Sequence, residues 1–169
     1  NKRIAYCIYD KSGDKEAEYL HNMQMNHILK EALAKDLVIP FFQPILNLNN
    51  QKIEKYETLM RIKKEDGSYY LPHEFLHVAK HSKLYSKLSM SLIQKAFETF
   101  QISSSGFSIN LSYLDMTNIV TTTFIIEKLE EFNVGPWVIF EILESDGIEN
   151  YDAVSKFIEK VKSYGAKIA

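Results

Sequence analysis

The chain has 169 residues, of which 46% are hydrophobic and 25% are charged, as is ordinary for a soluble globular domain with a buried core. Its formal net charge of −2 at pH 7 argues against a polyanionic partner such as DNA and leaves room for a small anionic ligand held by local cations. The single cysteine, Cys7, excludes an internal disulfide and a cysteine zinc cluster, and no apolar run reaches the ~18 residues of a membrane span. We expect a cytoplasmic domain.

The first 36 residues differ in texture from the rest of the chain. Residues 3–9 predict a short strand, and a cluster of turn residues follows it. Residues 15–36 predict an amphipathic helix, because Met25, Ile28 and Leu29 follow the 3.6-residue period. We expect this helix to be a connector that leads into a domain spanning 37–169.

Strands and helices alternate from Leu37 onward. The pattern predicts strands at 38–46, 52–62, 106–112 and 137–145, helices at 73–81, 85–100, 116–132 and 150–163, and the start of a further strand in the last four residues. Pro40 and Pro44 favour an edge or irregular position for the first strand, which pairs with the second as an antiparallel hairpin. Alternating apolar strands and helices indicate a parallel sheet covered by helices. Because a (β/α)₈ barrel needs about 250 residues, we predict an α/β fold: a partial TIM-like barrel with an antiparallel first strand, truncated after about five strands.

Three polar residues interrupt apolar strands: Glu57 in YETLMRI, Asn110 in FSINLS and Glu141 in VIFEILE. Burying such a group costs several kcal/mol unless a partner satisfies it. In a barrel, functional groups gather at the C-terminal ends of the strands. Three oxygen ligands there can share a hard cation. Taken alone, Asn110 is equally well a hydrogen-bonding cap or a bulge.

The neighbouring polar residues have structural alternatives as well. Glu57 and Arg61 share a strand face, so they can form an ion pair at the strand rim. Glu141 and Glu144 are either one buried and one surface glutamate, or a pair that divides metal ligation and loop positioning. Gln43, in FFQPI, can simply hydrogen-bond to the adjacent strand.

A competing motif is His73-Glu74-Phe75-Leu76-His77, which matches the H-E-x-x-H pattern of zinc hydrolases. On a helix its histidines would share a face with His81, and Glu98 is a loose candidate for a third ligand. Against this zinc hydrolase, the motif falls in the first helical turn and lacks the glycine-containing extension of metzincins. Solvated surface histidines are the simpler interpretation.

Six stretches, taken in order, resemble the EAL family of bacterial cyclic di-GMP phosphodiesterases: FFQPIL, YETLMRI, LPHEFLHVAKHS, FSINLS, FEILES and YGAKIA. Together they cover essentially all of 37–169, and the family signature reads Glu-Thr-Leu here. The resemblance implies a (β/α)₈ barrel whose first strand is antiparallel. RIAYCIYD and the helix after it resemble the last strand of a GGDEF domain and a connector. We therefore divide the chain into 1–36, the end of a GGDEF-like domain plus connector, and 37–169, the N-terminal half of an EAL domain.

The resemblance also implies a site and a reaction. The implied metal ligands are Glu57, Asn110 and Glu141, and Glu144 is the implied loop-positioning glutamate. Arg61 would contact a substrate phosphate and Gln43 a guanine edge. The implied reaction is two-metal hydrolysis of cyclic di-GMP to linear pGpG. All-oxygen ligation suits Mg²⁺ or Mn²⁺ better than zinc.

The family's paired aspartates and its later lysine and glutamate have no counterpart in the 169 residues. We therefore expect this piece to be inactive by itself, although the intact parent would be a phosphodiesterase, tethered to a membrane if other regions provide an anchor. The alternative is a non-catalytic module that binds cyclic di-GMP or mediates contacts. Because a partial barrel leaves strand edges unpaired, we also expect a homodimer or a swapped oligomer.

Overall fold

The computed structural model describes residues 14–103, 105–142 and 151–169, so the strand predicted at 3–9 and the residue Glu144 lie outside it. Its elements, in chain order, are α1 (Asp14–Ala34), β1 (Val38–Asn47), β2 (Lys52–Lys63), β3 (Tyr69–Tyr70), α2 (Pro72–His81), α3 (Tyr85–Phe100), β4 (Gly106–Leu111), α4 (Tyr113–Thr117), α5 (Ile119–Phe132), the 3₁₀ turn η1 (Gly135–Trp137), β5 (Val138–Ile142), α6 (Tyr151–Ser163) and β6 (Lys167–Ile168).

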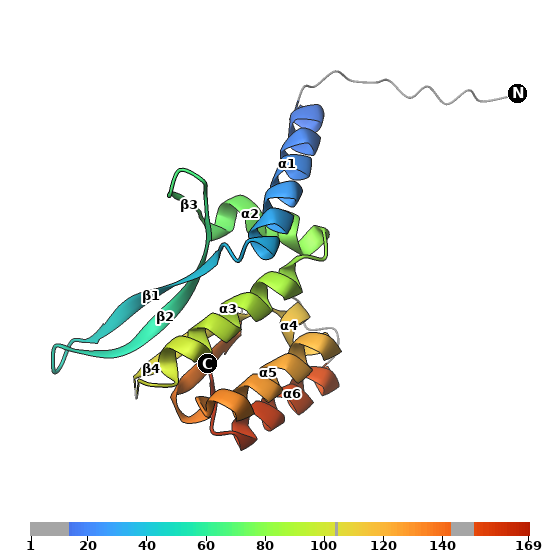
Figure 1. Cartoon of the computed structure of the whole chain (residues 1–169). Coiled ribbons are helices and arrows are strands. Elements are labelled where there is room, and N and C mark those ends of the chain that lie inside the picture. The colour runs from blue at the N-terminus through green and yellow to red at the C-terminus, as the bar shows by residue number, and fades with distance from the viewer. Residues whose placement is uncertain (1–13, 104, 143–150) are drawn as a thin grey trace, which may run out of the picture.

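The strands form one sheet with the order β1-β2-β4-β5-β6, and β3 pairs with β2 off this path (Figure 1). β1 is antiparallel to β2, whereas β2, β4, β5 and β6 are parallel to one another. Pro40 and Pro44 lie in β1, which ends the strand order and carries a register shift between Ile45 and Leu46. The predicted α/β fold with an antiparallel first strand is therefore confirmed, and the sheet is open over the described residues.

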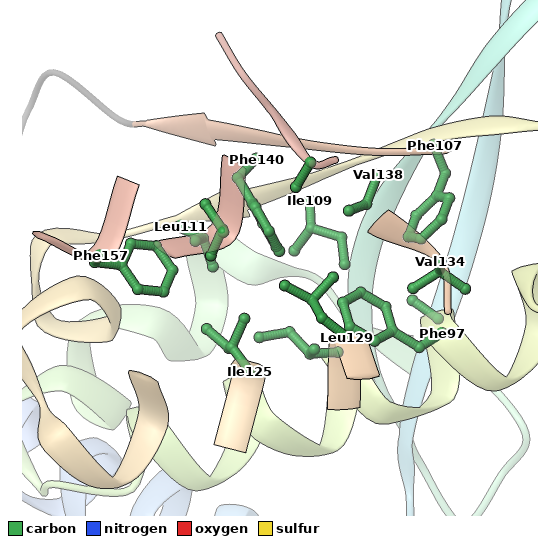
Figure 2. Close-up of a cluster of buried hydrophobic side chains, with 14 of the residues drawn as sticks. Phe97, Phe107, Ile109, Leu111, Ile125, Leu129, Val134, Val138, Phe140 and Phe157 are labelled. Atoms are coloured by element: carbon green, nitrogen blue, oxygen red, sulfur yellow. The ribbon is translucent and has the colours of Figure 1, made fainter. Parts of the chain in front are cut away.

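The main core lies between the sheet and helices α3, α5 and α6 (Figure 2). Alternate residues of β4 and β5 point into it, because successive side chains of a strand face opposite sides. Its large members, all fully or almost fully buried, are Phe97, Phe107, Ile109, Leu111, Ile125, Leu129, Val138, Phe140 and Phe157. Each such side chain contributes roughly 1.5–3 kcal/mol on burial. The remaining residues of these strands point away from the helices.

A second core joins α1 to the hairpin and to α2 and α3. Met25, Leu29 and Ala32 of α1 are buried in it, beside Phe75 of α2 and Ile62 of β2. The predicted connector helix is thus packed onto the domain along its C-terminal half. Within the described residues, none of the helices combines the length and the apolar character needed to cross a membrane.

The helix predicted at 116–132 is instead two helices, α4 and α5, which meet at Asn118. The backbone of Asn118 is extended, with ψ of 115°, and its Oδ1 accepts hydrogen bonds from the N–H groups of Val120 and Thr121 at 2.9 and 3.2 Å. An asparagine that caps the next helix in this way satisfies two of its free N–H groups. The apolar period runs on through the break, which is why the pattern alone missed it.

Gly135, in the turn before β5, is expected to tolerate no side chain. A Cβ atom there would overlap the backbone carbonyl of Tyr164, which cannot move without displacing the end of α6. We expect Gly135→Ala to lower the free energy of unfolding by about 1–3 kcal/mol, as measured by urea denaturation. Gly106→Ala is the matched control, because its Cβ would meet its nearest neighbour at an ordinary 3.5 Å. Equal stability of the two variants would contradict the packing argument.

Candidate functional site

The polar residues of the strands meet on the sheet face that points away from the helices. Glu57 of β2 is in register with Ser108 of β4, and Asn110 of β4 is in register with Glu141 of β5. Residues in register share a face of the sheet, and residues two apart on a strand do so too. The structure therefore brings Glu57, Asn110 and Glu141 to one face on three adjacent parallel strands.

Asn110 and Glu57 are in direct contact. The Nδ2 of Asn110 donates a hydrogen bond to Oε1 of Glu57 at 3.1 Å, and both residues are half-buried. The register of β4 continues through Asn110 to Leu111, so Asn110 is neither a bulge nor a strand cap. Its amide and the Glu57 carboxylate satisfy each other across two strands, which offsets the cost of burying them.

Glu141 has a partner that the sequence analysis missed. The Nζ of Lys55 lies 2.9 Å from Oε1 of Glu141, and the exposed fractions of the two side chains are 24% and 28%. Lys55 stands two residues before Glu57 on β2, so strand alternation puts both on the same face. The two-residue spacing from Glu57 is the only sequence feature that predicts where Lys55 lies. It predicts the face of the sheet but cannot identify a partner 86 positions away.

The two predicted substrate contacts lie on the hairpin. Gln43 is exposed on β1, and its Cα is in register with that of Glu57. Arg61 is half-buried, its Nη1 donates to the carbonyl of Met60 at 2.9 Å, and its guanidinium carbon lies 5.6 Å from the centre of the Phe41 ring. In the described part of the chain Arg61 makes no ion pair with Glu57, so the structural alternative proposed for this pair is wrong.

A buried network holds the turn that follows β4. Oδ2 of Asp115 accepts hydrogen bonds from the N–H and the hydroxyl of Ser112, both at 2.9 Å, and from the hydroxyl of Tyr85, also at 2.9 Å. Asp115 is completely buried, and this desolvation raises its pKa even though the hydrogen bonds from Ser112 and Tyr85 act in the opposite direction. The network anchors the chain two residues beyond Asn110.

The polar residues of the H-E-x-x-H motif make hydrogen-bond contacts within helix α2 and at its start. The Glu74 carboxylate accepts the Leu71 N–H at 2.6 Å and so caps the helix start, and Nδ1 of His81 lies 2.8 Å from the carbonyl oxygen of His77. No group of three or more His, Cys, Asp or Glu able to hold a metal occurs among the residues that the structure describes. The motif histidines and Glu98 therefore do not come together as a metal-binding cluster.

The chain is thus an α/β domain with an open, mostly parallel sheet, whose carboxylate and amide groups lie on the face away from the helices. A family model described as the EAL domain matches residues 26–169, and the chain belongs to this family. The match begins inside α1, whose C-terminal half is packed on the domain. The division at residues 36 and 37 and the GGDEF-like N-terminal piece stay predictions.

The chain is similar to several longer bacterial proteins, one of which is named as a probable cyclic di-GMP phosphodiesterase. It is 29% identical over 106 residues to the probable cyclic di-GMP phosphodiesterase PdeG of Escherichia coli, covering 60% of this chain and 21% of that protein. It is 28% identical over 165 residues to an uncharacterized 76.5 kDa protein of Thiocystis violacea, covering 94% of this chain and 23% of that protein. The chain thus spans less than a quarter of the length of either relative.

A solved structure shares the fold. The EAL domain of FimX from Xanthomonas citri, in complex with cyclic di-GMP, superposes with a TM-score of 0.77 at 20% identity. The superposition covers 90% of this chain and 62% of that one. At this identity the likeness establishes the shared architecture.

The raised pKa of Asp115 predicts a pH dependence of stability. The folded state holds this proton to higher pH than the unfolded state, whose carboxyl titrates near 3.8, so the free energy of unfolding falls as pH rises from about 4 through the raised pKa. Asp115→Asn removes this contribution. The difference in unfolding free energy between wild type and Asp115→Asn, measured by urea denaturation at several pH values, should therefore fall with rising pH.

Asp66→Asn is the matched control. Hydrogen bonds from Ser68 lower the pKa of the exposed Asp66, so the wild-type-minus-Asp66→Asn difference in unfolding free energy should rise with pH. A wild-type-minus-Asp115→Asn difference that stays flat with pH would refute the assigned cause.

Proposed function

We propose that the chain supplies part of the active centre of a cyclic di-GMP phosphodiesterase, which hydrolyses cyclic di-GMP to linear pGpG. The observation that carries this proposal is the junction of Glu57, Asn110 and Glu141 on three adjacent strands, with the Asn110 amide held on Glu57 at 3.1 Å. Membership of the EAL family and the cyclic di-GMP complex of a structural neighbour support the choice of ligand.

The donor atoms of this junction fit Mg²⁺ or Mn²⁺. Two carboxylates and an amide oxygen are hard ligands, of the kind these ions prefer over the sulfur and imidazole ligands typical of zinc. The hydrogen bond from Nδ2 of Asn110 orients the amide and leaves Oδ1 as the atom to face a cation. Ser108 lies on the same face, and its buried hydroxyl oxygen has no hydrogen-bond partner among the described residues. An additional polar ligand or water at this position would satisfy it.

In the proposed reaction each residue has a distinct task. Glu57, Asn110 and Glu141 hold the cation, which when bound neutralises charge on the phosphoryl oxygens. Arg61 contacts a phosphate and Gln43 a guanine edge, both from the β1–β2 hairpin that also carries Glu57. The positioning role of Glu144 belongs to the same proposal. We further propose a cytoplasmic protein that forms a homodimer or a swapped oligomer.

A second candidate is a domain that binds cyclic di-GMP without hydrolysing it. The Lys55–Glu141 ion pair favours this candidate, because it places a positive charge on one of the proposed metal ligands. The two candidates share the ligand and differ in whether a divalent cation is held tightly enough for turnover.

Removing the Glu57 carboxylate tests whether this residue is needed for hydrolysis of cyclic di-GMP. In the natural protein that contains this chain, Glu57→Gln should lower Mn²⁺-dependent pGpG formation by at least about 100-fold, because a charged metal ligand is lost. Products are measured by liquid chromatography. Glu54→Gln, on the same strand but exposed and three residues before Glu57, should retain wild-type activity. Full activity of Glu57→Gln would rule out the proposed role of this residue.

The 169-residue chain by itself should form no pGpG, because Glu57, Asn110 and Glu141 supply ligands for only one of the two metal ions. The same chromatographic assay, at saturating Mn²⁺ and with the natural protein as positive control, tests this. Metal-dependent pGpG formation by the isolated chain would show that these residues suffice for catalysis.

A further inference from the structure

The Lys55–Glu141 pair joins a cation to a proposed metal ligand across the middle of the sheet. The ammonium Nζ and the carboxylate Oε1 are 2.9 Å apart, a charge-assisted hydrogen bond as well as an ion pair. About three quarters of each side chain is shielded from solvent, so the attraction is less screened than at an open surface.

The strand between the partners makes this contact possible. β4 separates β2 from β5, and its two residues nearest Lys55 on this face are Gly106 and Ser108. Lys55 is in register with Gly106, and a Cβ built on that glycine would stand 3.5 Å from the Lys55 Cβ. Because these β4 residues are small, the lysine can cross the strand and reach Glu141.

The charges at the junction are then partly balanced by the protein itself. Glu57 and Glu141 carry two negative charges, Asn110 carries none, and Lys55 adds one positive charge. A divalent cation that contacts Glu141 must either displace the ammonium from Oε1 or lie close to it, and like charges at short range repel strongly. In either case the lysine opposes the metal.

We propose that Lys55 is a built-in counter-ion that competes with the divalent cation for Glu141 and thereby weakens metal binding by this chain. The inference rests on the proposed function, since it concerns the same metal site. It identifies metal occupancy as the step that Lys55 controls, and it makes Lys55 a positioning residue for Glu141 rather than a metal ligand or a catalytic residue.

Mn²⁺ binding to the 169-residue chain tests the proposal without reference to activity. Free Mn²⁺ is followed by electron paramagnetic resonance during titration of the wild type and of Lys55→Gln. We expect Lys55→Gln to bind Mn²⁺ about tenfold more tightly, the effect of removing one ion-pair competitor from a half-buried site. Lys55→Arg keeps the charge and should bind like the wild type.

Lys52→Gln is the matched control, because Lys52 is exposed at the start of the same strand and its loss changes the net charge equally. Its Mn²⁺ affinity should stay within about twofold of wild type if only the general field changes. Thermal unfolding of each variant confirms that the fold is kept, and Lys55→Met replaces Lys55→Gln if the latter unfolds early.

An unchanged or lower Mn²⁺ affinity of Lys55→Gln overturns the competition. Adding Glu57→Gln to the Lys55→Gln chain separates this failure from failure of the metal site itself. If binding depends on Glu57 but not on Lys55, the site stands and the competition is wrong. If Glu57→Gln leaves the affinity unchanged, the proposed metal site is wrong.

Discussion

The structure depends on the side-chain alternation of three parallel strands, β2, β4 and β5. One set of residues, typified by Phe107 and Phe140, is buried against the helices and supplies the main core (Figure 2). The other set carries Glu57, Asn110 and Glu141 to the opposite face. Because the side-chain period is two, a slip of one residue in any strand would send its polar group into the core. The register that buries the core residues is therefore also the register that places the polar residues on the opposite face.

Pairing is the second constraint on the polar face. Each of its two half-buried carboxylates has a specific partner: Glu57 has the Asn110 amide, and Glu141 has the Lys55 ammonium. Unpaired, either group would cost several kcal/mol to desolvate. The two pairs are chemically unequal, however, because the amide orients a carboxylate while leaving its charge available, whereas the ammonium cancels that charge. The site thus combines one ligand pair open to a cation with one ligand already engaged.

Much of this was readable in the sequence, for physical reasons that differ between elements. Most of the described strands and helices followed from their periods, although the short β3 was missed, and the edge position of β1 followed from Pro40 and Pro44, whose missing N–H groups suit an unpaired side. The break at Asn118 was missed because a side-chain cap leaves the apolar period intact. Lys55 was missed because its partner is distant in sequence, and the Glu57–Arg61 pairing was wrong because the guanidinium binds the Met60 carbonyl instead.

The packing of α1 connects this helix to the hairpin that carries part of the polar face. Leu29 and Ala32 fix the last turns of this helix in the second core, and only residues 35–37 separate it from β1 (Figure 1). The Leu37 carbonyl also accepts the Lys63 N–H, which ties this joint to the end of β2. The exposed N-terminal half of α1 is therefore connected, through its packed C-terminal half, to the hairpin that bears Gln43 and Glu57.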